Sequence, residues 1–192
     1  MKTSCSLHKF TDRFGYYSGQ CTCGLRYADF VAGYNSEDEL SLVSCINAYR
    51  AAQVLPKMLM DPILMLVARE RVKVFNHHAN GQWVWEAARV AGYKGFCTDN
   101  LAKGYDTPAE AVGDTQSGWG DRREGHNVGH SDQMLGFFKM NGKFVDYKFD
   151  QIGVASYPEK KQYIAIFGTL NPPDFYKYGY GVSTSLPQIK QP

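Results

Sequence analysis

The 192-residue sequence has no long hydrophobic run and no excess of charge of one sign. No segment reaches the roughly 18 apolar residues of a membrane span, and the N-terminus lacks the apolar core of a signal peptide. The 21 basic and 19 acidic residues are interleaved and leave a net charge of +2, too little to attract nucleic acid or an anionic membrane. We therefore expect no membrane span, no nucleic-acid partner, and synthesis in the cytoplasm without a signal peptide.

Cysteine is scarce and odd in number, which does not fit an evenly spread disulfide framework. The five cysteines are Cys5, Cys21, Cys23, Cys45 and Cys97. Near the N-terminus, Cys5 and His8 form a C-x2-H pair, and a C-x-C pair follows at Cys21 and Cys23. Four such ligands suit one tetrahedral, structural Zn²⁺, which would replace the core that residues 1–35 are too short to form. Reduced thiols and a disulfide are the alternatives.

Helical signals dominate the chain from Ser36 onwards. Acidic residues after Ser36 begin one apolar-periodic run, and Asp61-Pro62 begins a second with an N-cap followed by a first-turn proline. A third segment, WVWEAARVAGY, has its stop signal at Gly92, and a fourth begins after Thr107-Pro108. The spacing therefore predicts four helices ahead of GHSDQMLG, residues 129–136.

Strand signals follow in the last third of the chain. FFKMNGKFVDYKF contains the hairpin signal Asn141-Gly142, and QIGVASY and KQYIAIFGTL are rich in β-branched and aromatic residues. Helices first and strands last predict an α+β domain over residues 36–169, with helices covering a small antiparallel sheet. Residues 170–192 are rich in Pro, Gly and Tyr without a period, and we expect an extended arm that binds protein partners.

Five segments in order resemble a known family. INAYRAAQVLPKMLMDPILMLVARERV, which carries the N-x-x-R pair of Asn47 and Arg50, resembles the opening helices of the CAP superfamily of cysteine-rich secretory, antigen-five and pathogenesis-related proteins. AARVAGYKGFCTDNLAKG and TPAEAV are similar to the next two family segments. GHSDQML resembles the Gly-His-x-x-Gln-(Met/Leu) signature, and QIGVASY with YIAIFG resembles the last two strands. The resemblance covers roughly residues 38–168 and suggests a bacterial-type member, for which a phage is one expected source.

The resemblance implies a three-layer α-β-α sandwich with two histidines and two acids lining a cleft. His130 falls at the second histidine, and His78 or its neighbour His77 at the first. Asp99 stands where the family has a longer Glu, and the second acid has no clean counterpart. The possible positions for that second acid are Glu124 and, less well placed, Glu110.

Such a cleft offers two chemical roles. The first is a divalent-metal site built from His78, Asp99 and His130, with His126 or Glu124 as a further ligand, because imidazole and carboxylate suit Zn²⁺. The second is a satisfied polar network that fixes the loops. For nucleophilic catalysis the chain offers Ser117, Ser131 and Cys97, of which Cys97 is interpreted as a buried, inert thiol.

We expect a non-catalytic CAP-like binding or structural module. Reduced-looking cysteines, abundant tyrosine, the missing signal peptide and the C-terminal arm together favour a component of a larger assembly, such as a phage virion or tail. The alternatives are a metal-dependent hydrolase acting on a cell-envelope polymer or peptide through the His/Asp cleft, and a lipid-binding module, as some family members are.

Overall fold

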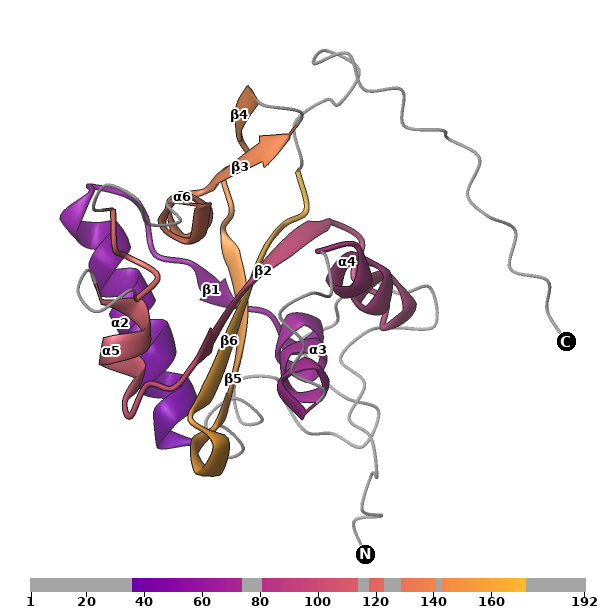
Figure 1. Ribbon diagram of the computed structural model, residues 1–192. Helices are drawn as coiled ribbons and strands as arrows, with labels where there is room; N and C mark the ends of the chain where they lie inside the picture. The colour runs from indigo at the N-terminus through magenta and orange to yellow at the C-terminus, as the bar shows by residue number, and fades with distance from the viewer. Residues whose placement is uncertain (1–35, 74–80, 114–117, 123–128, 141–142, 172–192) are drawn as a thin grey trace, which may run out of the picture.

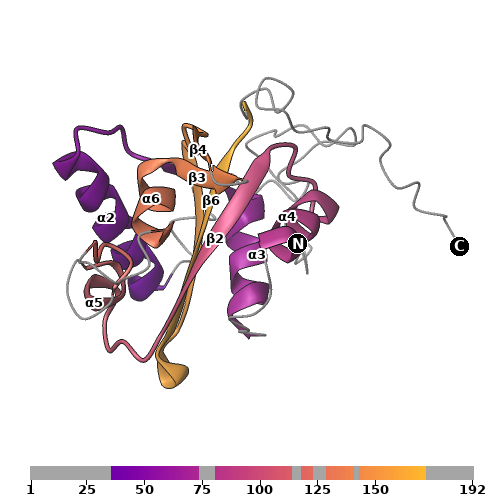
Figure 2. The same cartoon turned by 45° about the horizontal axis from the view of Figure 1, so that its top comes forward.

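The computed structural model describes residues 36–73, 81–113, 118–122, 129–140 and 143–171. The helices are α2 (Glu37–Ala52), α3 (Pro62–Lys73), α4 (Gly81–Val90), α5 (Pro108–Val112), α6 (Gly129–Leu135) and the 3-10 turn η1 (Pro158–Lys160). The strands are β1 (Leu59–Met60), β2 (Phe96–Lys103), β3 (Phe137–Met140), β4 (Lys143–Asp146), β5 (Gln151–Tyr157) and β6 (Gln162–Thr169). Helices α2, α5 and α6 lie on one side of the central sheet, and α3 and α4 lie on the other (Figures 1 and 2).

The predicted starts of α2, α3 and α5 and the predicted stop of α4 are confirmed, and each has a local cause. Ser36 and Glu39 form a capping box at the start of α2, so two backbone N–H groups that the helix leaves unpaired are satisfied. Asp61 accepts the backbone N–H groups of residues 63 and 64 ahead of α3. Thr107 caps α5, with Pro108 in its first turn. Gly92, with φ of +102°, takes the left-handed backbone just after α4.

The sheet corrects the predicted all-antiparallel meander. Its strand order is β1-β5-β6-β2, and β1 runs parallel to β5 while the other neighbours are antiparallel. FFKMNGKFVDYKF does form a hairpin, β3–β4, but this hairpin makes a separate two-stranded sheet. The place beside β6 is taken by β2, which the sequence pattern did not mark as a strand. The domain is thus α+β with a mixed four-stranded sheet covered by helices.

Two clusters of buried side chains lie on the two faces of the sheet. Strand β6 is buried along its whole length because its side chains alternate between these clusters, which is typical of a central strand covered on both faces. One cluster includes Leu42 and Ile46 of α2, and the other includes Leu64 of α3. Helix α3 packs directly on β5: a Cβ atom at Gly153 would come within 2.1 Å of the carbonyl carbon of Leu64, so this position requires glycine.

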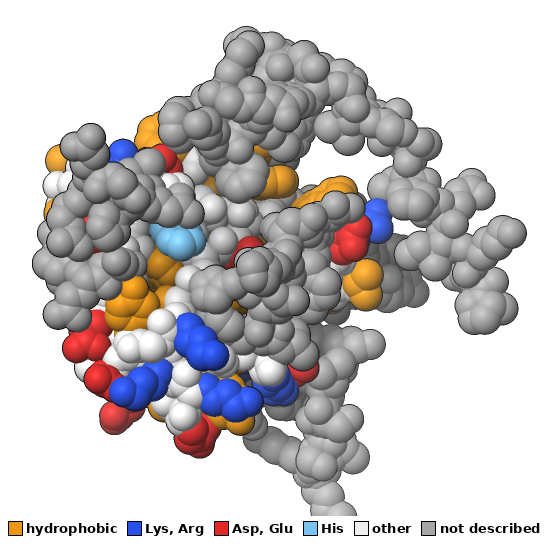
Figure 3. Space-filling model, in the orientation of Figure 1, with side chains coloured by type: hydrophobic (Ala, Val, Ile, Leu, Met, Phe, Trp, Pro, Cys, Tyr) orange, Lys and Arg blue, Asp and Glu red, His pale blue; other side chains and the backbone are white. Residues whose placement is uncertain are grey.

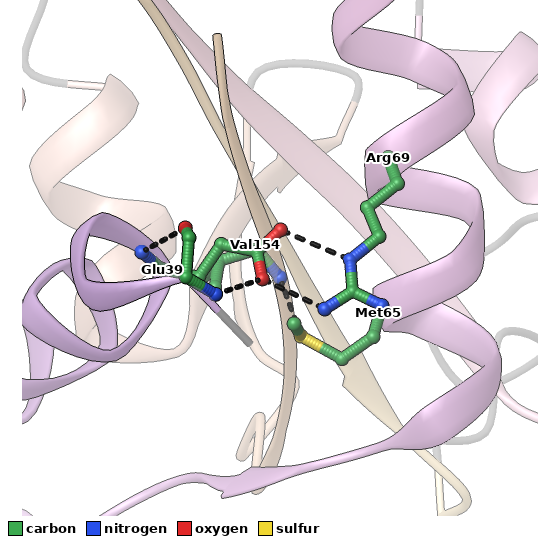
Figure 4. Close-up of polar contacts among 5 residues, drawn as sticks. Glu39, Met65, Arg69 and Val154 are labelled. Atoms are coloured by element: carbon green, nitrogen blue, oxygen red, sulfur yellow. Dashed lines mark hydrogen bonds and ion pairs between the residues drawn. The ribbon is translucent and has the colours of Figure 1, made fainter. Parts of the chain in front are cut away.

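The edge of β5 beyond the two-residue strand β1 is covered by the helices. The backbone N–H of Val154 donates to the thioether sulfur of Met65 at 3.1 Å. Next to this contact, Glu39 of α2 forms an ion pair with Arg69 of α3, as Figure 4 shows. Backbone groups on an open strand edge can pair with other chains, so this covering protects the domain against edge-to-edge association.

The N-terminal zinc-binding segment and the C-terminal arm that were predicted, residues 1–35 and 170–192, lie almost wholly outside the described residues. Within the described part of the chain, none of the helices is both long enough and apolar enough to cross a membrane.

Candidate functional site

Strand β2 directs neighbouring side chains to opposite faces of the sheet. Cys97 and Leu101 pack in the cluster formed with α3 and α4, whereas Ala102 packs in the cluster formed with α2. Because side chains alternate along a strand, Asp99 faces the first side and Asn100 the second. The Asp-Asn dipeptide of the family-like segment therefore contacts both helical layers at once.

Asp99 is bound by an arginine of α3. Its Oδ2 lies 3.2 Å from Nε of Arg71, and the two side chains are 6% and 1% exposed, respectively. Burial raises the pKa of the Asp99 carboxyl, and the Arg71 charge opposes that shift. An acid held in this way by a buried guanidinium has its charge compensated within the protein, which reduces its attraction for a metal ion.

On the other face, two side chains of β2 contact α6. Asn100 donates from Nδ2 to the backbone carbonyl oxygen of His130 at 2.8 Å, and Thr98 Oγ1 bonds to Gln133 Oε1 at 3.1 Å. His130, at the second residue of α6, is half-buried. The structure therefore directs the side chain of Asp99 towards α3, whereas His130 lies in α6 on the other side of the sheet. The two predicted site residues are linked through Asn100, the neighbour of Asp99 in β2.

The remaining nucleophile candidates of the described chain are engaged in the fold. Ser131 is fully buried, and its Oγ accepts a hydrogen bond from Nη1 of Arg122 at 2.7 Å. The same Nη1 contacts Asp132 Oδ1 at 2.8 Å. Burial raises the pKa of the Cys97 thiol to about 12, so at neutral pH it is not a thiolate. The interpretation of Cys97 as a buried thiol is confirmed, and its low reactivity stays a prediction.

Other predicted positions have structural partners or lie outside the described ranges. Glu110 accepts from the backbone of residues 106 and 107 at the start of α5. Among the described residues no three His, Cys, Asp or Glu side chains are disposed to hold a metal ion. The predicted residues outside the described ranges are Cys5, His8, Cys21, Cys23, His77, His78, Ser117, Glu124 and His126. Their roles as metal ligands, acid or nucleophile stay predictions.

Sequence reasoning missed the partners that hold this region. Arg71 follows Leu64, Val67 and Ala68 at helical spacing on the buried face of α3, and a charged residue at such a position was the available signal of a buried ion pair. The N-x-x-R pair binds backbone: Asn47 makes two hydrogen bonds to the main chain of Met58, and Arg50 donates to three carbonyl oxygens. Trp119 is also structural, because its buried Nε1 donates to the carbonyl oxygen of Leu101.

The described surface around this region carries charge of both signs. In the face shown in Figure 3, basic and acidic side chains lie beside each other at the lower end. On this face the described charges of opposite sign are interleaved, so their fields partly cancel there.

Comparisons with solved structures relate the fold to bacterial proteins. An outer surface protein from Borrelia burgdorferi is 18% identical with a TM-score of 0.52, and the match covers 70% of this chain and 93% of that protein. A cysteine-rich secretory protein from Staphylococcus aureus is 14% identical with a TM-score of 0.51, covering 71% and 40%. An extracellular protein with an SCP domain from Bacillus anthracis is 17% identical with a TM-score of 0.52, covering 76% and 44%.

These similarities concern the fold, and the chain spans less than half of the length of the last two proteins. No curated protein matches the sequence. The matched structures do not support the predicted phage origin, since all three come from bacteria. Residues 43–171 match the cysteine-rich secretory protein family over most of the chain, close to the predicted range of 38–168. The chain belongs to this CAP family.

Proposed function

We propose that this CAP domain is a binding or structural module that does not catalyse a reaction. The observation that carries the proposal is the buried ion pair between Asp99 and Arg71. A metal-dependent hydrolase needs an acidic group that is free to bind the metal or to take a proton from water. In this chain the acid at the family position contacts Arg71 instead.

The described hydroxyl and thiol groups support the same proposal. A nucleophile must be accessible and activated by a neighbouring base. Ser131 is fully buried and accepts a hydrogen bond from Arg122, a cation that does not act as a base. Cys97 is 1% exposed, and its thiol hydrogen points towards the carbonyl oxygen of Val84 at a distance of 3.9 Å between sulfur and oxygen.

We further propose that the module binds protein partners and that residues 170–192 take part in that binding. The matched structures are described as an outer surface, a secretory and an extracellular protein, which is consistent with binding roles at surfaces. Assembly into a virion has no support from those descriptions. Truncation after residue 171 tests the arm: loss of partner capture with an unchanged circular dichroism spectrum is expected, and unchanged capture contradicts its role.

The test of the non-catalytic proposal is a hydrolysis assay on the full chain. Purified protein is incubated with cell-wall polymer and with a peptide library, each with and without added Zn²⁺, beside the His130→Ala variant. We expect no product above the buffer control in any arm. Product that disappears in His130→Ala, while the variant keeps its unfolding midpoint, would establish the hydrolase instead. Retention of a fluorescent lipid by the wild type would favour the lipid-binding alternative.

We also propose a structural zinc bound by Cys5, His8, Cys21 and Cys23, on the basis of their ligand types and spacing. Elemental analysis of wild type, Cys21→Ser/Cys23→Ser and His130→Ala separates the two predicted metal sites. One zinc per chain, lost only in the double cysteine variant, is expected. Metal that is lost only in His130→Ala would place it in the cleft, and protein without metal in any sample contradicts both sites.

A further inference from the structure

Asn100 is a fully buried amide at the middle of β2. Its backbone pairs with Ala165 of β6, and its side chain faces the layer that contains α6. Nδ2 donates to the backbone carbonyl oxygen of His130 at 2.8 Å. Oδ1 is enclosed and has no donor among the residues that the structure describes. Among the described residues, therefore, the Asn100 Nδ2 group has a hydrogen-bond partner and Oδ1 has none.

Stability does not explain an amide in this position. The net gain from one hydrogen bond is smaller than the cost of leaving a buried acceptor unsatisfied, so Asn100 contributes little or unfavourably to folding. Asn100→Leu removes the unsatisfied amide oxygen but also leaves the carbonyl oxygen of His130 without this donor, so its two effects on stability oppose each other. Departures of this kind from the rules of a well-packed core are expected where a residue serves function.

The Asn100 side chain donates its hydrogen bond to the backbone of His130, which is the only residue of α6 that was predicted to line the cleft. Helix α6 has only seven residues, so it has few hydrogen bonds of its own and its placement depends on contacts with the sheet and with other side chains such as Arg50 of α2. Thr98, on the same face of β2, contacts Gln133 one turn further along α6. Asn100 thus fixes the first turn of α6, and Thr98 fixes the second.

We propose that Asn100 is a positioning residue, which holds the main chain of His130 against β2 and so sets the direction in which the imidazole leaves α6. Asp99 acts on the opposite face through Arg71 and has no part in this contact. This role requires a hydrogen-bond donor at position 100 whose backbone is fixed. The pairing of β2 with β6 fixes the backbone of Asn100 in the sheet.

The experiment records the imidazole signals of full-length protein labelled with ¹³C-histidine, with the His130 signal assigned by its loss in His130→Gln. In Asn100→Leu we expect the His130 signal to shift or broaden at a fixed pH. The unfolding midpoint is expected to rise or to stay within about 4 °C of the wild type. The matched control Thr98→Val removes the other contact of β2 with α6 and is expected to leave the His130 signal in place.

An unchanged His130 signal in folded Asn100→Leu overturns the proposal. A large fall in unfolding midpoint does the same, because it would make the amide a source of stability. Asn100→Ser, which is smaller and cannot reach α6, is measured in parallel so that a folding failure of the leucine variant does not end the test. The readout needs neither substrate nor partner, so its result is independent of whether the chain catalyses a reaction.

Discussion

Glu39 and Arg69 join the two helical layers of the domain around the edge of the sheet, with Oε2 and Nη2 2.7 Å apart (Figure 4). A second contact, Nε to Oε1 at 3.0 Å, makes the pair bidentate. The Glu39 carboxylate also accepts the backbone N–H of Ser36 at the start of α2. One carboxylate therefore caps α2 and connects it to α3, beside the part of β5 that pairs with no strand among the described residues.

Removing the Arg69 side of this pair should destabilise the domain. Arg69→Met leaves the Glu39 carboxylate, 7% exposed, without its cation, and we expect the free energy of unfolding to fall by about 1–3 kcal/mol. The matched control is Lys73→Met in the same helix, which breaks the exposed pair with Glu70 and should cost under about 0.5 kcal/mol. Urea unfolding measures both values. Equal losses in the two variants would show that the Glu39 pair has no special role.

Arg50 should be sensitive even to a conservative change. Its buried guanidinium donates to the carbonyl oxygens of Pro56, Met134 and Phe149, which come from three separate segments. Lysine keeps the charge but cannot span three acceptors with a planar fork, so we expect Arg50→Lys to lower the free energy of unfolding by about 2–4 kcal/mol. The comparison is Arg89→Lys on α4, where the arginine lies over the Trp85 ring and a small effect is expected. A loss under about 1 kcal/mol for Arg50→Lys would contradict this account.

The sequence predicted the helices well because their start signals are local. Ser36 with Glu39, and Thr107 with Pro108, mark their helices within four residues of chain. The family resemblance likewise depended on short motifs in order. Strand β2 was missed because FCTDNLAK has polar residues at three consecutive positions, so it follows neither a two-residue nor a helical period.

The candidate site was harder to predict because its contacts are distant in the sequence. Asp99 pairs with Arg71, 28 residues away, and Asn100 bonds to His130, 30 residues away. The motif indicated that Asp99 and His130 belong to one region, but alternation along β2 sends Asp99 away from α6. That outcome depends on which residues of β2 pair with β6, and register of this kind is set by the whole sheet rather than by the motif.

Cys97 should be the slowest cysteine to react in the folded domain. The reactive species is the thiolate, and burial raises the pKa of this thiol to about 12, so little thiolate exists at pH 8. Cys45, which is half-buried, is the comparison within the same chain. Alkylation with iodoacetamide followed by peptide mass mapping should label Cys45 first and Cys97 only as fast as the domain unfolds. Equal labelling rates in native buffer would contradict the buried position of Cys97.

Asp61 should make the stability of the domain depend on pH. Burial raises the pKa of its carboxyl in the folded state, although hydrogen bonds from the backbone of Ile63 and Leu64 oppose the shift. A raised carboxyl pKa means that the folded state binds the proton more tightly, so this contribution is present below the unfolded value of about 4 and is lost as pH rises through the folded value. Asp61→Asn keeps an N-cap side chain and removes the charge. We therefore expect its stability relative to wild type to increase from pH 4 upwards, as measured by urea unfolding at several pH values. The difference in stability between Asp61→Ser and wild type should follow the same course. A difference that is constant with pH, or falls as pH rises, would show that burial does not raise the pKa of the Asp61 carboxyl.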